Sequence, residues 1–291
     1  MAVISFFAID MEIITSLSNN RIKKVMQIAS KSSVRKEEGL FVAEGTKLVR
    51  EAPADWIEEV YVSETFFGRS SGNGREGCGD SQPEGFLKSL PDEKIIKVSE
   101  HVFEKVSTQK TPQGMLAVLK IPHYTEDDVK NGLNNESRNH NPLILVLEDI
   151  QDPGNVGTIF RTAEAAGVSG IVLSEKCADP YSPKTVRATM GAIFRLPFIV
   201  ADDLVKYVGS LKNEGITSYA ARLNGAETYY DCDFTKACVI LVGNEGNGLS
   251  EELSDAASSG VYIPMSGQTE SLNAAISASV LMYEARRQRS I

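Results

Sequence analysis

The stretch LILVLEDIQDPGNVGTIFRTAEAAG, residues 143–167, decides the fold of this chain. Residues 143–150 form an apolar run of the kind found in a strand that is buried on both faces of a sheet. A turn and a helix follow at once, and we expect Asn155 to cap that helix and Gly167 to end it. A buried strand that leads directly into a helix is the repeating unit of an α/β fold.

The same alternation of strand and helix continues to the end of the chain. We expect further strands at 170–174, 197–200, 217–223, 238–243 and 261–265, and helices at 182–194, 203–215, 250–257 and 270–288. Such alternation predicts a mostly parallel sheet. Ligands of parallel sheets bind at the carboxyl ends of the strands, so the segments that follow each strand are the candidate site.

The first part of the chain predicts a smaller α/β domain. We expect an amphipathic helix at 20–31, strands at 41–43, 58–64, 94–100 and 114–122, a helix after the first of these strands and a helical turn at 101–108. The Gly- and Ser-rich segment 68–85 is expected to be a loop, and the polar segment 131–141 a linker. Residues 1–15 read as a frayed extension rather than a signal peptide, with Met11 as an alternative start.

The composition is that of a globular protein large enough for two domains. The chain has 291 residues, of which 42% are hydrophobic and 24% charged, and no apolar run approaches the roughly 20 residues of a membrane span. Its cysteines and histidines are scattered, at Cys78, Cys177, Cys232, Cys238, His101, His123 and His140. This spacing predicts reduced thiols in the cytoplasm, no bound metal, and chemistry that does not use histidine.

The net charge of −9 alone argues against a nucleic-acid partner, but the charge is unevenly distributed. Residues 1–122 carry −1 and residues 123–291 carry −8. Within 16–50 the charge is +5, from three glutamates against eight basic residues: Arg21, Lys23, Lys24, Lys31, Arg35, Lys36, Lys47 and Arg50. Such a patch can bind phosphates even on an acidic chain, the alternative being an ordinary solvated helix face.

A second segment that suits ligand binding is ILVGNEGNGLSEEL, residues 240–253, which follows a predicted strand. Its glycines and asparagines could cradle a phosphate. However, the spacing is not G-x-G-x-x-G, and the lysine of a P-loop is missing. Glu245 would also repel a phosphate, so we expect a neutral or cationic ligand here.

A third segment, IPMSGQTESLNAAISASVLMYEARRQ, residues 263–288, joins a loop to the closing helix. We expect that helix to start near Ser271, with Asn273 in its first turn. The small residues of the helix allow close packing, although its apolar stripe is also what a plain core helix would have.

Taken together and in this order, the three segments resemble the SpoU, or TrmH-like, family of RNA 2′-O-ribose methyltransferases. The similar motifs are DPGNVGTIFRTAEAAG (152–167), LVGNEGNGLS (241–250) and the segment 263–288, and the resemblance covers about residues 142–291. The N-terminal segments VAEGTKLVREA (42–52) and FEKVSTQKTPQGMLAV (103–118) resemble the substrate-binding domain of that family, which is similar to RNA-binding ribosomal proteins.

The resemblance implies a SPOUT-type parallel α/β sheet with a C-terminal trefoil knot, plus a smaller N-terminal α/β domain. It divides the chain into an extension at 1–15, a substrate RNA-binding domain at 16–122, a linker at 123–141 and a knotted methyltransferase domain at 142–291. It further implies a cytoplasmic homodimer with the helix at 271–285 at the contact. The implied substrate is RNA, and the two-domain layout with a substrate-binding domain favours ribosomal over transfer RNA.

Carried over to this chain, the resemblance implies a site for the methyl donor S-adenosylmethionine and a polar catalytic set. The donor would be held by Ala221, Gly243, Ile263, Met265 and Leu272, and the catalytic set is Asn155, Arg161, Glu245, Ser271 and Asn273.

A ribose hydroxyl is a weak acid, so the enzyme must align it and assist its loss of a proton. Arg161 is described in the family as a base, but a guanidinium keeps its proton up to a pKa of about 12. We therefore expect Arg161 to grip a phosphate and stabilise the developing alkoxide, while Glu245 orients it or receives the proton.

Two other functions stay open from the sequence alone. One is a non-catalytic RNA-binding protein that keeps the fold, against which the intact polar set argues. The other is a Rossmann-type nucleotide enzyme, which would need a glycine-rich loop after its first strand and an acidic residue for the ribose, and neither is present as required.

Overall fold

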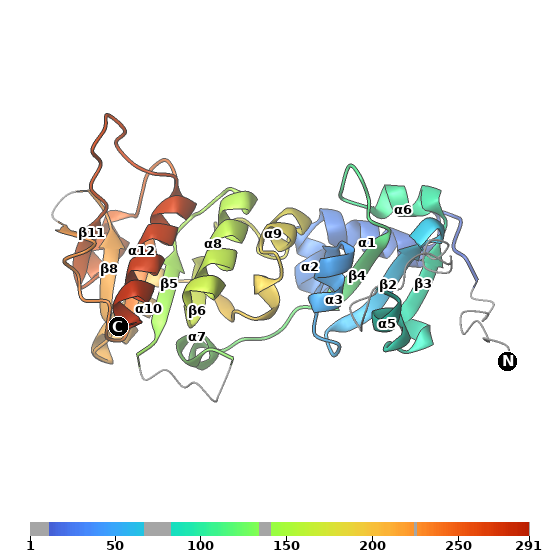
Figure 1. Ribbon diagram of the computed structural model, residues 1–291, viewed down its shortest axis with the longest axis horizontal. Coiled ribbons are helices and arrows are strands. Elements are labelled where there is room, and N and C mark those ends of the chain that lie inside the picture. Colours follow the sequence, from blue (N-terminus) through green and yellow to red (C-terminus); the bar gives the residue numbers. More distant parts are fainter. Residues whose placement is uncertain (1–11, 67–82, 134–140, 224–225, 291) are drawn as a thin grey trace. The chain divides into compact units, whose positions relative to one another are not determined.

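The computed structural model describes residues 12–66, 83–133, 141–223 and 226–290. The chain forms two compact units (Figure 1). The first ends at Pro122 and also takes in Tyr181–Pro183, and the second holds His123–Pro180 and Lys184–Ile291. Each unit is built around its own sheet.

The first unit contains a four-stranded sheet. In spatial order its strands are β1 (Leu40–Glu44), β4 (Met115–Lys120), β2 (Ile57–Ser63) and β3 (Ile95–Val98). Its helices are α1 (Asn20–Ser30), α2 (Ser32–Glu38), α3 (Thr46–Glu51), α5 (Pro83–Lys88), α6 (Glu100–Val106) and the 3₁₀ turn η1 (Asp92–Lys94). Strand β4 is antiparallel to both neighbours, whereas β3 is parallel to β2. The four expected strands are thus confirmed.

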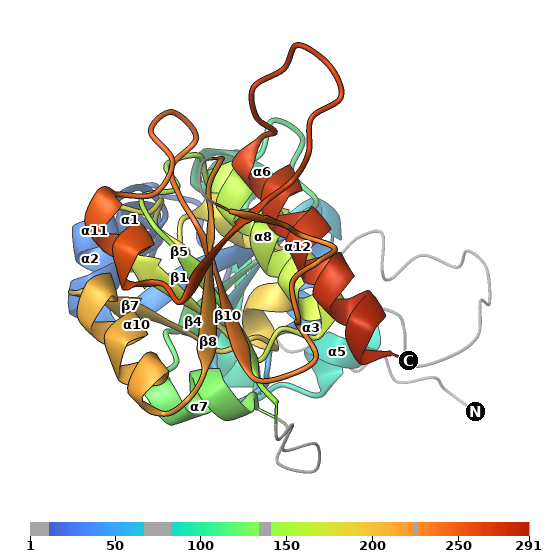
Figure 2. The ribbon, with the colours of Figure 1, turned by 90° about the vertical axis from the view of Figure 1, so that its left-hand side faces the viewer.

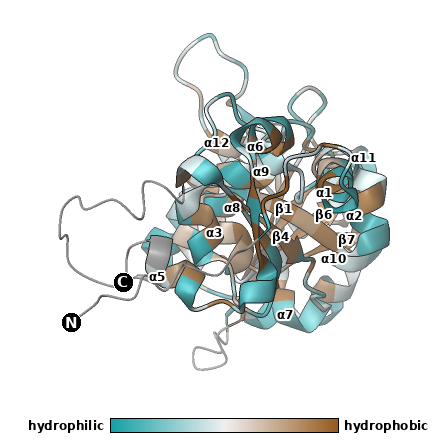
Figure 3. Ribbon diagram, turned by 90° about the vertical axis from the view of Figure 1, so that its right-hand side faces the viewer, coloured by the Kyte–Doolittle hydropathy of each residue, from teal (hydrophilic) through white to brown (hydrophobic). Residues whose placement is uncertain are grey.

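The apolar faces of α1 and α6 cover this sheet. Ile22 and Val25 of α1 and Phe103 of α6 belong to one buried cluster with Tyr61 of β2. Figure 3 shows β1 and β4 coloured mainly as hydrophobic, which fits their burial. The amphipathic helix predicted at 20–31 is confirmed by this packing.

Two expectations for this unit need correction or fall outside the structure. The N–H of Ile14 donates to the Lys97 carbonyl over 3.0 Å, and the Ile14 carbonyl accepts from the N–H of Ser99 over 3.0 Å. The interpretation of 1–15 as frayed is therefore wrong at Ile14, because the open edge of β3 offers backbone partners; residues 1–11 lie outside the described residues. The loop expected at 68–85 is largely outside them too, and its end forms the start of α5.

The second unit contains a seven-stranded sheet in which every pairing is parallel. Its spatial order is β7 (Phe198–Ala201), β6 (Gly170–Ser174), β5 (Leu143–Leu147), β10 (Cys238–Val242), β8 (Thr217–Ala221), β11 (Ser259–Tyr262) and β9 (Glu227–Thr228). This confirms the predicted parallel α/β fold. Strand β10 enters between β5 and β8, so segments far apart in sequence end side by side.

Helices cover both faces of this sheet. They are α7 (Glu126–Asn131), α8 (Pro153–Ala166), α9 (Pro183–Ala188), α10 (Leu204–Asn213), α11 (Glu251–Ala256), α12 (Ala274–Arg289) and the 3₁₀ turn η3 (Ala192–Phe194). Helices α8 and α12 pack together on one face, and α10 and α11 lie on the other (Figure 2). Val208 and Leu211 of α10 share a buried cluster with Val239 and Leu241 of β10.

The linker expected at 123–141 contains helix α7, so that interpretation is wrong for residues 126–131. The hydroxyl of Thr125 accepts from the Asp128 N–H, and the Asp128 carboxylate accepts from the Thr125 N–H over 2.7 Å. Val129 is fully buried in the cluster that includes residues of β5 and β6. A reciprocal cap and one buried side chain are enough to hold this short helix against the sheet.

Two helix starts differ from the expected positions. Asp152, not Asn155, caps α8, because its carboxylate accepts from the backbone N–H of Asn155 over 2.9 Å. Helix α12 begins at Ala274 rather than near Ser271, because the Asn273 side chain is its cap.

The helix expected at 182–194 is also shorter. It ends at Ala188 because Met190 and Gly191 take left-handed backbone angles, with φ of 51° and 90°. A helical residue cannot adopt these angles, so the chain resumes only as the turn η3.

The last turn of α12 fastens the end of the chain to the second unit. The Arg289 guanidinium donates to the carbonyls of Phe234, Asn141 and Lys236 over 2.7, 2.8 and 2.6 Å. The Gln288 side-chain oxygen accepts from the Phe234 N–H over 2.8 Å. These bonds hold the segments that lead into β5 and β10.

Candidate active site

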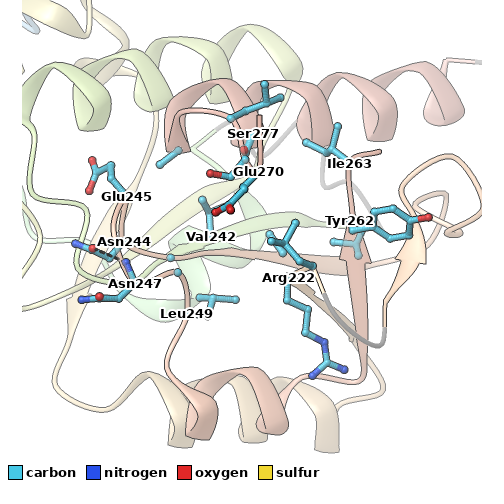
Figure 4. Close-up of a pocket in the computed structure, with 18 of the residues that line it drawn as sticks. Arg222, Val242, Asn244, Glu245, Asn247, Leu249, Tyr262, Ile263, Glu270 and Ser277 are labelled. Carbon is cyan, nitrogen blue, oxygen red and sulfur yellow. Dashed lines mark hydrogen bonds between the residues drawn. The ribbon is translucent and has the colours of Figure 1, made fainter. Parts of the chain in front are cut away.

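A cavity of about 410 Å³ lies at the carboxyl ends of β8, β10 and β11 (Figure 4). Three segments line it: residues 221–223 after β8, 242–249 at the end of β10, and 261–272 at the end of β11; the first turns of α12 complete it. All five residues expected to hold the donor are among its lining: Ala221, Gly243, Ile263, Met265 and Leu272. The structure thus brings this set together in one place.

The loop after β10 forms one tight wall of the cavity. The N–H of Asn244 donates to the Gly248 carbonyl over 3.0 Å, and the Gly248 N–H returns a bond of 2.9 Å. The Asn244 side-chain oxygen accepts from the N–H groups of Gly246 and Asn247 over 2.8 and 3.1 Å. Gly243 has no room for a side chain, because an added Cβ would lie 2.2 Å from the backbone of Gly248.

The loops after β5 and β10 are tied to each other. The Asn244 side chain donates to the Asp149 carbonyl over 2.8 Å. The Glu148 carboxylate accepts from both the N–H and the hydroxyl of Ser250, each over 2.7 Å. Sequence reasoning missed these residues as part of the site. The available signal was an acidic pair, Glu148 and Asp149, directly at the end of a buried strand.

Three members of the expected catalytic set form a chain of hydrogen bonds beside the cavity. The Asn155 Nδ2 donates to Glu245 Oε1 over 2.7 Å, and the Asn273 Nδ2 donates to Asn155 Oδ1 over 3.2 Å. Asn273 is itself fixed, since its oxygen accepts from the N–H of Ala275 over 2.9 Å. The start of α8, the loop after β10 and the start of α12 therefore meet in this chain.

Asp152 supports this arrangement by holding the backbone of Asn155. The pKa of Asp152 is lowered because the backbone N–H of Asn155 donates to its carboxylate, with the Lys184 ammonium 3.2 Å away as a weaker cause. The carboxylate is thus kept ionised, and it anchors the first turn of α8.

The remaining two members of the set lie apart from the chain of bonds. Ser271 lines the cavity and is exposed. Arg161, two turns into α8, is also exposed, and its guanidinium forms no hydrogen bond or ion pair with the described residues. The neighbouring Thr162 faces α12, where the Ser279 hydroxyl donates to it over 3.4 Å. Arg161 is therefore free to contact a ligand.

Among the described residues, no three His, Cys, Asp or Glu side chains are grouped so that they could hold a metal ion. No helix in the described ranges is long and apolar enough to cross a membrane.

A ligand-sized cavity at the carboxyl edge of a parallel sheet, bordered by a fixed carboxylate and amides, is typical of α/β enzymes that bind a small organic molecule. The sequence pattern of the SpoU rRNA Methylase family matches residues 142–283, and that of the MRM3-like substrate binding domain matches residues 19–117. The chain belongs to the SpoU rRNA methylase family, as its sequence motifs predicted.

Individual relatives agree with this membership over nearly the whole chain. An uncharacterized tRNA/rRNA methyltransferase of Synechocystis is 32% identical, covering 96% of this chain and 95% of the relative. The 23S rRNA (guanosine(2553)-2′-O)-methyltransferase RlmP of Bacillus subtilis is 30% identical, covering 95% of this chain and 100% of the relative. The solved AdoMet-bound rRNA methyltransferase of Sinorhizobium meliloti is 28% identical, with a TM-score of 0.77 over 95% of this chain and 98% of that one.

Proposed function

We propose that this chain is an enzyme that transfers a methyl group from S-adenosylmethionine to a ribose 2′-hydroxyl of RNA. The observation that carries the proposal is that the second and third family motifs line one cavity, and that Asn155 of the first motif is bound to Glu245 at its edge. Membership of the SpoU rRNA methylase family supports methyl transfer. The 2′-O-methyltransferase from Bacillus subtilis supports the ribose target and favours ribosomal over transfer RNA.

The cavity is suited to S-adenosylmethionine. Its volume of about 410 Å³ is in the range of small-molecule sites, roughly 300 to 1,000 Å³. Apolar side chains of Ile263 and Leu272 and the side-chain-free backbone at Gly243 would hold the adenine and ribose. When bound, the donor supplies a methyl group that its sulfonium has already activated.

This chain's own residues would position the acceptor and manage its proton. We place a phosphate of the RNA on Arg161, whose permanently charged fork of donors also stabilises the developing alkoxide. Glu245 would receive the hydroxyl proton, because one of its oxygens is held by Asn155 and the carboxylate is exposed at the edge of the cavity. Asn273 fixes Asn155, and Ser271 lies on the cavity wall where donor and acceptor would meet.

The same proposal covers the two domains, the knot, the location and the assembly of the enzyme. The region at 16–122 would bind the RNA as a domain similar to RNA-binding ribosomal proteins, which the match to a substrate binding domain supports. The domain at 142–291 would carry the trefoil knot, formed by the segments around the cavity. We further propose that the enzyme acts in the cytoplasm, without metal, as a homodimer through α12, on which Ile276 and Tyr283 are 49% and 52% exposed.

The direct test is transfer of a labelled methyl group from S-adenosylmethionine to total RNA, followed by mapping of the modified nucleotide. We expect label in one ribosomal RNA position, resistant to alkaline cleavage because the 2′-oxygen is methylated. Label on a base, or no label with a protein that binds RNA, would contradict the proposal and favour a different methyl acceptor or a binding protein.

A further inference from the structure

The charged side chains that line the cavity point in different directions. Glu270, in the loop before α12, points into the cavity (Figure 4). Arg222 is the only Lys, Arg or His among the described lining residues, and its guanidinium extends away toward α11, where it donates to the Ser254 hydroxyl over 3.2 Å. Glu245 lies at the edge and faces Asn155. The interior of the cavity therefore presents one carboxylate and no cation.

We propose that Glu270 makes this site prefer the cationic methyl donor over its neutral product. This inference rests on the proposed function, since it assumes that S-adenosylmethionine occupies the cavity. At neutral pH the donor carries a sulfonium, an ammonium and a carboxylate, so its net charge is +1. After transfer the sulfonium has become a thioether, because the methyl group leaves without the bonding pair, and the product S-adenosylhomocysteine has net charge zero. The hydroxyl proton departs separately.

A carboxylate inside the cavity attracts the +1 donor and has no net charge to attract in the product. The same side chain thus strengthens donor binding and favours release of the product after each turnover. The carboxylate of Glu270 is exposed, so solvent screening reduces the attraction to that of a surface ion pair, about three- to fivefold in affinity. The discrimination would weaken as salt is added.

The experiment is calorimetric titration of the full-length protein with S-adenosylmethionine, S-adenosylhomocysteine and sinefungin, whose amine gives it a charge in place of the sulfonium. In Glu270→Gln we expect affinity for the two cationic ligands to fall about three- to fivefold, with affinity for S-adenosylhomocysteine changed less than twofold. Glu270→Asp should keep most of the preference. The matched control is Glu252→Gln, which removes the same charge from the exposed side of α11, outside the cavity.

Equal loss of affinity for all three ligands in Glu270→Gln would overturn the proposal and indicate shape rather than charge. No change for any ligand would overturn it as well. Failure of the proposed function looks different, because the wild-type protein would then bind none of the three.

Discussion

Asn155 Nδ2 and Glu245 Oε1 lie 2.7 Å apart although 90 residues separate them in the chain. The bond joins the first turn of α8 to the loop after β10, and Asn273 extends it to the start of α12. The Asn155 amide is therefore a point at which all three motifs of the family are linked. The orientation of the Glu245 carboxylate depends on it.

The first prediction concerns this amide. Asn155→Asp replaces the amide that donates the hydrogen bond with a second carboxylate facing Glu245, so the two side chains should separate by repulsion. We expect the rate of methyl transfer to fall about 10²-fold, as displacement of a positioned group by about 1 Å can cost that much. The affinity for S-adenosylmethionine should stay within twofold of the wild-type value, because Asn155 does not line the cavity. Single-turnover transfer measures the rate, and calorimetry measures the affinity for S-adenosylmethionine. Asn213→Asp on α10 is the matched control. An unaffected rate in Asn155→Asp would mean that Asn155 is not part of the active site.

The second prediction concerns Arg161. Arg161→Ala should lower the transfer rate about 10²- to 10³-fold, the usual effect of losing one group that stabilises developing charge. Arg161→Lys should recover little, because an ammonium lacks the planar pair of donors. Donor affinity should not change. Lys212→Ala, which removes an exposed cation from a different helix, α10, serves as the control. Loss of donor binding in Arg161→Ala would instead place this residue in the donor site.

The third prediction concerns RNA binding by the first unit. A cavity of about 510 Å³ is lined by Lys47, Arg50, Glu51, Gly85, Phe86 and Ser89. The Lys47 side chain is 75% exposed, and its ammonium lies 3.9 Å from the Glu51 carboxylate. Lys47→Glu or Arg50→Glu should weaken RNA affinity and lower the salt dependence of binding by about one ion for each phosphate that is no longer bound. Filter binding across salt concentrations tests this. Lys120→Glu, at the end of β4 and outside this cavity, should have a much smaller effect. Equal effects of the substitutions would indicate a nonspecific response to net charge.

The fourth prediction concerns assembly. Ile276 and Tyr283 are one heptad apart on α12, so they lie on the same side of the helix, and both are about half exposed. Ile276→Asp should convert a homodimer into a monomer, as measured by light scattering at micromolar concentration. Val205→Asp on α10, where the valine is 40% exposed, should leave the dimer intact. A wild-type monomer would refute the proposed assembly.

The fifth prediction concerns acid stability. The pKa of Glu284 is lowered because the Arg287 side chain donates to its carboxylate, and Gln288 adds a further bond. A lowered pKa in the folded state means that stability from this group is present above its unfolded pKa of about 4.3 and is lost as pH falls through the folded value.

The melting temperature of Glu284→Gln should therefore lie below that of the wild type at pH 7, and the gap should narrow below about pH 4. Thermal melts at a series of pH values check this. Glu252→Gln, exposed and outside this cluster, should show no such narrowing. A gap that stays constant with pH would mean that packing, not ionisation, gives Glu284 its effect.

The strands were predictable because burial on both faces leaves an unbroken apolar run, as in β5 and β10. Ends of elements were not, since they depend on single hydrogen bonds. Asp152 rather than Asn155 caps α8 because its carboxylate reaches the helix N–H group. Helix α7 was missed because one buried side chain, Val129, holds it, and one apolar residue makes no periodic pattern.

The site was predictable to the extent that its members lie in motifs. Ala221 and Leu272 line one cavity as the resemblance implied, but the placement of β10 between β5 and β8 is what brings their segments together. No local pattern encodes that placement. The tie between Glu148 and Ser250, 102 residues apart, escaped prediction for the same reason.

The bonds from Arg289 to the backbone at Asn141, Phe234 and Lys236 also bear on how the protein is made. Synthesis proceeds from the N-terminus, so Arg289 is still inside the ribosome when the segments that it fastens have already emerged. The first unit can fold during translation, but we expect the second to complete its packing only once Arg289 has also emerged.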